Sequence, residues 1–368
     1  MLHHHDTRPY ELAAREAADH ARQKLDALIE RGRALAGQVI ESVMNTRPVD
    51  RVVRGGGLEF TVKGQAVELG LGEVQETLHD HALSQAATRV GLPQAYVAHL
   101  LADEHAPWGV ELLAHNLQHL YGRLLGDARL LTRSVDGQVR AVLSDRFRRM
   151  DSRPIIDSFA KACRAVGALP VEGYATDVKI AIKAVLPQVF EPVRNEVMAY
   201  GIVLENSDYG AGALSLRTFA LRLWCSNYAI TDESLREVHL GARLADDIAW
   251  SSETHRLDTA RMSSAIGDVV RAELDVGRLD ELQSIIRRAD AEKVDARAVG
   301  ALLKKHLNRG ELRRATEAFD GPDVELLPPG QSVWRVSNAI SWLAGQTTDT
   351  TRKLELMRAA GSVLSAVG

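Results

Sequence analysis

Apolar residues recur along the chain with two different periods, and these periods define three regions. From Tyr10 to about Met44, leucine and valine recur at helical spacing in Ala-, Arg- and Glu-rich sequence, which predicts a long amphipathic helix. In the centre apolar and polar residues alternate, as in a sheet with one covered face. Beyond about Ile230 the helical period returns and continues to a final helix over Arg352–Val363, with Asp349 or Thr350 as its cap.

The centre contains two hairpin signals and one helix. Residues 58–69 alternate around a glycine-containing turn and predict a small hairpin, and the glycine run before it, Arg54–Gly57, predicts a flexible linker. Asp136-Gly137 predicts a two-residue turn between strands over 128–135 and 139–143. A helix over Ile155–Val166 follows, closed by Gly167. Further apolar strands are expected near 178–182, 197–204 and 213–225.

This order of elements favours the α+β class, with a central antiparallel sheet, a β-hairpin and a packed helix, flanked by helical N- and C-terminal regions. It divides the chain into an N-terminal helical arm (residues 1–54), an α+β core (55–245) and a helical C-terminal region (246–368). With 368 residues, 45% of them hydrophobic, the chain is large enough to bury a substantial core.

Charge and cysteine content restrict the function classes. The formal net charge is −4 and the isoelectric point about 6.4, which excludes a uniformly basic nucleic-acid coat and requires any such surface to be local. The two cysteines, Cys163 and Cys225, form neither a disulfide framework nor a CxxC pair. With no apolar signal segment and no window long enough to span a bilayer, we expect a cytoplasmic protein.

The segment Ser144–Arg153 concentrates arginine. Between Asp127 and Arg153 there are seven arginines against four aspartates, a local excess of positive charge. Arginine forks bind phosphates, an aromatic ring can stack on a base, and a helix amino end attracts anions. The candidate nucleic-acid-binding residues are Arg140, Arg146, Phe147, Arg148, Arg149, Arg153, Lys179 and Lys183.

Two other interpretations stay open. The acidic residues Asp145, Asp151 and Asp157 are placed to pair with these arginines in a purely structural network. A second basic stretch, residues 287–314, has interleaved acids and favours a solvated helix face, with nucleic-acid binding as the secondary interpretation.

His115 and His119 are four residues apart on a predicted helix and are able to face one metal ion. The sequence contains no HExxH motif and no cysteine at a zinc spacing near them. A metal-dependent enzyme therefore rests on this pair alone, and neither a cofactor nor a resident metal is expected.

Several segments in the same order resemble a phage/plasmid-like family of domains of unknown function. They are HALSQAATRVGLPQAYVAHLL, LLAHNLQHL, VRAVLSDRFRRMD, VLENSDYGAGALSLRTFALRLWCSNYAI and VHLGARL, between Gly57 and Leu244. Tyr228 departs from the pattern, which has a glycine there. The arrangement of a hairpin, a sheet and a packed helix is also loosely similar to Rad52-type single-strand annealing proteins.

The resemblance implies a protein of mobile-element DNA metabolism. The leading hypothesis is a non-enzymatic single-stranded-DNA-binding protein, with recombination annealing as a homo-oligomer as its candidate role. The alternatives are a metal-dependent enzyme of mobile-element DNA metabolism and a structural or interaction protein without nucleic acid.

Overall fold

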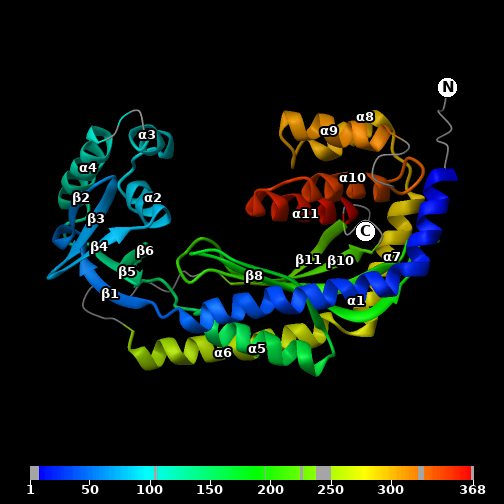
Figure 1. Cartoon of the computed structure of the whole chain (residues 1–368), viewed down its shortest axis with the longest axis horizontal. Helices are drawn as coiled ribbons and strands as arrows, with labels where there is room; N and C mark the ends of the chain where they lie inside the picture. Colours follow the sequence, from blue (N-terminus) through cyan, green and yellow to red (C-terminus); the bar gives the residue numbers. More distant parts are fainter. Residues whose placement is uncertain are drawn as a thin grey trace.

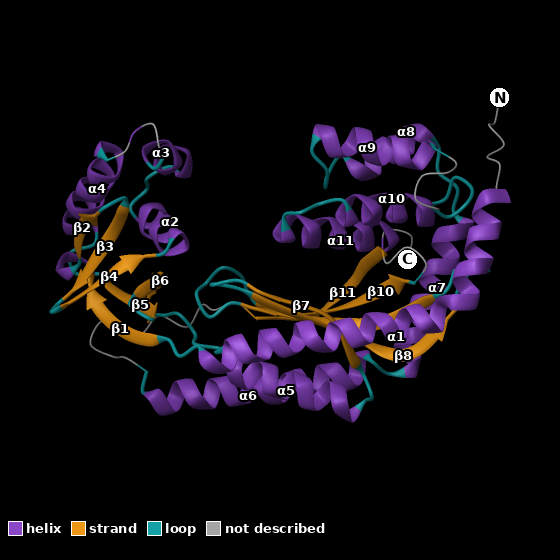
Figure 2. Cartoon of the chain, in the orientation of Figure 1, coloured by secondary structure: helices purple, strands orange, loops and turns teal. Residues whose placement is uncertain are grey.

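The computed structural model describes residues 8–102, 105, 107–194, 196–223, 227–237, 250–321 and 327–365. It confirms the α+β class. The strands form two separate sheets, each with its own helices and its own apolar core (Figures 1 and 2). The sequence pattern led us to place the Asp136-Gly137 hairpin in one sheet with the later strands, but the structure divides them between the two.

The first sheet has six strands in the order β1-β5-β6-β4-β3-β2. All neighbours are antiparallel except β4 and β6, which run parallel. The strands are β1 (Val49–Arg54), β2 (Glu59–Lys63), β3 (Ala66–Leu71), β4 (Val74–Leu78), β5 (Arg129–Val135) and β6 (Gln138–Ser144). Helices α2 (Asp80–Arg89), α3 (Gln94–Leu100) and α4 (Trp108–Leu124) share a core with this sheet, centred on Leu69, Leu113 and Leu117.

Both predicted hairpins are confirmed. β2 and β3 are joined through Gly64 at φ +64°, and β5 and β6 through Asp136 and Gly137 at φ 50° and 77°. Two successive residues with positive φ make the tight turn that matches strand twist. The predicted linker is wrong: Gly55–Gly57 is a short 3-10 helix, and Gly55 donates to the Ala128 carbonyl at 2.8 Å. A Cβ on Gly55 would lie 2.3 Å from the Leu125 carbonyl oxygen, so close packing explains this glycine.

The second sheet has five antiparallel strands in the order β11-β10-β9-β8-β7. They are β7 (Leu169–Ala175), β8 (Ile180–Phe190), β9 (Met198–Asn206), β10 (Leu214–Arg222) and β11 (Asn227–Glu237). The long helix α1 (Arg8–Asn45) packs on β7, where Gly32 meets the backbone of Val171 and Gly173 lies against Ala36. The predicted N-terminal arm therefore belongs to the second sheet, whereas β1 belongs to the first.

Helices cover both faces of the second sheet (Figure 1). On one side lie α1, α5 (Ser152–Ala165) and α6 (Ser252–Glu273); on the other lie α10 (Val333–Gly345) and α11 (Thr350–Ser365). The remaining helices are α7 (Val276–Ala291), α8 (Ala296–Leu303) and α9 (Arg309–Asp320). Of the two predicted caps of α11, Asp349 is confirmed, because its Oδ1 accepts from the Arg352 amide at 2.7 Å. No helix in the described part of the chain is long and apolar enough to cross a membrane.

A third, small apolar cluster joins the two halves. Leu131, Ala141 and Leu143 of the first sheet pack there with Phe147, and with Tyr209 from the turn that follows β9. The same turn accepts hydrogen bonds from α2, since the Tyr209 carbonyl lies 2.9 Å from the Gln85 amide nitrogen. We call this region, around residues 207–213, the joint.

Candidate nucleic-acid interface

Most of the predicted arginine surface is engaged in ion pairs with distant residues. Arg148 binds Asp258 of α6 through two nitrogens, at 2.9 and 2.8 Å, and Arg149 Nε lies 3.0 Å from Asp50 Oδ2. Asp151 pairs instead with Arg133 at 2.7 Å. The structural network therefore exists, although the partners of Arg148 and Arg149 are not the acids that neighbour them in sequence.

The predicted role of Phe147 is wrong. Phe147 is only 6% exposed, and its ring belongs to the small cluster at the joint together with Leu131 and Leu143. A stacking platform needs a ring face open to the base. Phe147 follows β6 directly, in a turn in which its amide donates to the Ser144 carbonyl at 3.0 Å, and this turn places its ring against Leu131 and Leu143.

The amino end of α5, predicted to receive phosphate, already holds a carboxylate. Asp208 Oδ1 accepts from the Ser152 amide at 2.8 Å and from the Ser152 hydroxyl at 2.6 Å. The Asn206 side chain adds a longer bond of 3.3 Å to the same oxygen. The expectation of a phosphate at this helix end is thus corrected: a residue 56 positions away caps the helix.

Asp208 gives the joint a pH dependence. Burial, and next the Asp151 carboxylate, raise the pKa of Asp208 from 3.8 to about 6. Because the folded state holds this proton more tightly than the unfolded chain, protonation stabilises the fold below that pKa, and the stabilisation is lost as the pH rises through about 6. We expect the free energy of unfolding of wild type relative to Asp208→Asn to fall by about 1–3 kcal/mol between about pH 4.5 and pH 7.5.

The Asp208→Asn variant would keep the Oδ1 acceptor and remove only the titration. Urea unfolding of both proteins, followed by far-ultraviolet circular dichroism at the two pH values, measures the difference. A difference between the two proteins that does not change with pH would contradict this assignment.

The other predicted arginines divide into two kinds. Arg146 is exposed in the turn after β6, and Arg153 is half-exposed in the first turn of α5; the guanidinium of neither makes an ion pair or a hydrogen bond with another described residue. Arg140 donates to the Asp177 carbonyl at 3.0 Å and lies beside the Tyr209 ring. The structure therefore does not bring the arginines into one continuous groove.

The two predicted lysines lie in a different basic group. On the face of the second sheet that α11 covers, Lys183 Nζ is 2.6 Å from Glu172, and Lys179 Nζ is 3.7 Å from Glu205. We call this group the sheet cluster. Its basic members are Lys179, Lys183, Arg217, Lys353 and Arg358, and its acidic members are Glu172 and Glu205.

Glu205 is the centre of the sheet cluster. It is 2% exposed, and one of its oxygens, Oε2, accepts from Arg217 of β10 and from Arg358 of α11, each at 2.5 Å. Burial alone would raise the pKa of Glu205, but Arg358, Lys179 and Arg217 beside it lower that pKa below its usual value. A single carboxylate thus holds three cations together, from a strand end, a neighbouring strand and a helix.

Among the described side chains of the cluster, the basic members outnumber the acidic ones, and two of the basic members reach solvent. The side chains of Lys353 and Arg358 are 32% and 34% exposed, while Glu205 below them is buried. Tyr174 of β7 lies close enough for Glu205 and Arg358 to influence its pKa, which burial raises. Basic and aromatic side chains are the residue types that contact a phosphate backbone and its bases in proteins that bind single strands.

One feature of the sequence indicates this cluster. Arg217 stands in LSLRTFALR, a mostly apolar strand that ends on a second arginine, Arg222, and a charge in such a strand must find a buried partner. Nothing in the sequence indicates that Lys353 and Arg358 belong to the cluster, because they become neighbours of the sheet only when α11 packs on it.

His115 and His119 both lie exposed on α4. Within the described ranges, no three histidine, cysteine, aspartate or glutamate side chains come together as a metal would require. Cys163 is buried in α5, and burial raises the pKa of its thiol to about 12, as expected for a packing residue. Cys225 lies outside the described residues.

Comparison of the chain with models of protein families, with curated proteins and with solved structures found no match. The resemblance to the phage/plasmid-like family therefore stays a prediction.

Proposed function

We propose that the protein binds single-stranded DNA without catalysing a reaction, through the sheet cluster rather than through the arginine segment. The observation that carries the proposal is the excess of cations over acids among the described side chains of the sheet cluster. Two of these cations lie on α11 and are partly open to solvent: Lys353, which pairs with Glu172, and Arg358, which pairs with Glu205. Lys353 and Arg358 are the phosphate contacts, and Tyr174 is the candidate stacking ring.

In this proposal the DNA phosphates displace water from the exposed side chains of α11. Each phosphate neutralised by a basic side chain releases counterions, so affinity must fall steeply with salt. A role in recombination, as an annealing protein acting as a homo-oligomer, remains a prediction, and light scattering with and without oligonucleotide tests the oligomer.

We expect Lys353→Ala with Arg358→Ala to weaken binding of a fluorescent single-stranded oligonucleotide by about 10–100-fold at low salt. The slope of log affinity against log salt should become shallower by about 1.4, because two phosphate contacts are lost. Fluorescence anisotropy over a salt series measures both quantities.

The matched control is Lys304→Ala with Lys305→Ala, which removes the same charge from two exposed lysines after α8. We expect this control to leave the slope unchanged, and Arg148→Ala with Arg149→Ala to reduce stability with the slope likewise kept. An affinity that does not depend on salt, or a slope that changes only in the Arg148–Arg149 pair, would refute the sheet cluster as the interface.

The metal-dependent alternative predicts stoichiometric metal in the purified protein. Elemental analysis tests it, with His115→Ala and His119→Ala as the variants that should release the metal.

A further inference from the structure

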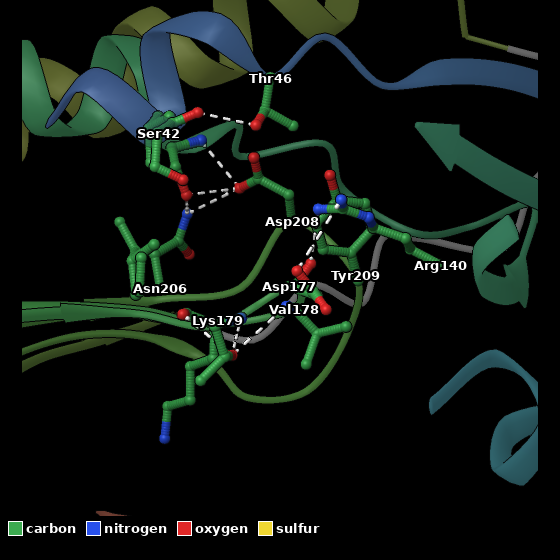
Figure 3. A pocket seen from close by; sticks show the side chains of 14 residues that line it. Ser42, Thr46, Arg140, Asp177, Val178, Lys179, Asn206, Asp208 and Tyr209 are labelled. Carbon is green, nitrogen blue, oxygen red and sulfur yellow. Dashed lines mark hydrogen bonds and ion pairs between the residues drawn. The ribbon is translucent and has the colours of Figure 1, made fainter. Parts of the chain in front are cut away.

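A cavity of about 170 Å³ lies at the joint, apart from the exposed members of the sheet cluster. Five segments supply its walls: the end of α1, β6, the start of α5, the turn between β7 and β8, and the end of β9 with the turn after it. Lys179 shares its backbone with this wall, while its side chain points away from Asn206 and Asp208 (Figure 3).

The cavity has an exposed rim and a polar, buried floor. Ser42, Thr176 and Asp177 are exposed at the rim, whereas Asn206 and Ser152 are at most 2% exposed. The Asn206 amide donates to the Met150 carbonyl at 2.8 Å and to the Ser152 hydroxyl at 3.1 Å, which fixes its orientation. The described hydrogen bonds of the Asp208 carboxyl all end on Oδ1.

Two polar side chains of the wall, Tyr209 and Arg140, lie against each other. Tyr209 is 5% exposed and the Arg140 guanidinium is the hydrogen-bond neighbour of its hydroxyl, whereas Arg140 Nε itself makes no hydrogen bond within the described part of the chain. The Arg140 guanidinium carbon lies 5.8 Å from the centre of the Tyr209 ring. A buried polar atom without a partner is costly, so Arg140 Nε favours a ligand or water that completes its bonding.

Size and lining restrict the ligand. An engineered cavity of about 150 Å³ holds one benzene ring, so this cavity has room for one small heteroaromatic ring. Val43, Val178 and Ile180 supply apolar contact, while the hydroxyls, the guanidinium and the Asp208 carboxyl offer both donors and acceptors. A flat ring with donors and acceptors on its edge is the chemistry of a nucleobase.

We propose that the joint cavity binds a nucleobase. The base can come from a free nucleoside or from one unstacked residue of a DNA strand, as in proteins that extrude a base into a pocket. Binding of a base that belongs to a DNA strand rests on the proposed function, whereas binding of a free nucleoside does not.

Titration of the full chain with each of the four deoxynucleosides, observed by saturation-transfer NMR, tests the cavity directly. We expect binding of at least one of them in the millimolar range or tighter, and none of 2-deoxyribose, which lacks the ring. Ser42→Phe should block the rim and weaken this binding by at least about tenfold, whereas Glu41→Phe, on the neighbouring exposed position of α1 outside the cavity, should not. Tyr209→Phe, which removes only the hydroxyl beside the Arg140 guanidinium, should weaken binding about fivefold.

An oligonucleotide with one base among abasic positions distinguishes the two sources. If the strand supplies the base, wild type should bind this strand more tightly than a fully abasic strand, and Ser42→Phe should remove that difference. Equal binding of both strands, together with no binding of any nucleoside, would leave a water-filled cavity and overturn the inference. That result would not affect the salt-dependent binding predicted for Lys353 and Arg358, so the two proposals fail separately.

Discussion

Arg133→Met is expected to lower the free energy of unfolding by about 3–5 kcal/mol, because it leaves two carboxylates at the joint without their shared cation. Arg133 is 2% exposed and lies 2.7 Å from both Asp50 of β1 and Asp151 before α5. It also donates to the Asp208 carbonyl at 2.7 Å. One side chain thus ties the edge of the first sheet to the start of α5 and to the turn after β9.

The control is Arg129→Met on the same strand. The Arg129 side chain is 25% exposed and its Nε lies 3.7 Å from Asp145, so a change of less than about 1 kcal/mol is expected. Urea unfolding followed by circular dichroism compares the two variants. Equal losses in both would show that the position on β5, and not the shared ion pairs, sets the stability.

The local elements of the fold were predictable because their signals are local. The Asp136-Gly137 turn needs two successive positive φ angles, and these two residues adopt them readily, so the hairpin follows from the dipeptide. Gly167, at φ +74° after α5, is predictable for the same reason. The division into two sheets was not predictable, since β6 pairs with β4 across more than fifty residues and alternation alone does not tell which strands are neighbours.

The arginine segment shows the limit of counting charges. The segment does contain more arginines than aspartates, but acids about one hundred residues away on either side neutralise two of its arginines. Asp50 of β1 pairs with Arg149, and Asp258 of α6 pairs with Arg148. Ion-pair partners are set by tertiary packing, here of α6 against α5 and of β1 against β5. The sheet cluster also depends on long-range contacts, which bring Lys353 and Arg358 of α11 beside Lys179 and Lys183, and its described side chains include more cations than acids.

Glu205→Gln is expected to change stability and binding in opposite directions. In the absence of ligand, the free energy of unfolding should fall by about 3 kcal/mol, because Lys179, Arg217 and Arg358 lose the carboxylate that separates their charges. The freed arginine donors and the lost negative charge should then favour a phosphate, and oligonucleotide affinity at low salt should rise by about tenfold.

Glu172→Gln is the matched control on the same sheet face. Glu172 is more exposed, at 28% of its side chain, and binds two lysines rather than two arginines, so both effects should be smaller. Thermal unfolding with and without saturating oligonucleotide gives the stability, and anisotropy gives the affinity. Since a ligand that binds only the folded state stabilises it more as its affinity rises, the oligonucleotide should restore more stability to Glu205→Gln than it adds to wild type. A variant that is less stable and binds no better would instead mean that the cations around Glu205 serve only to attach α11 to the sheet.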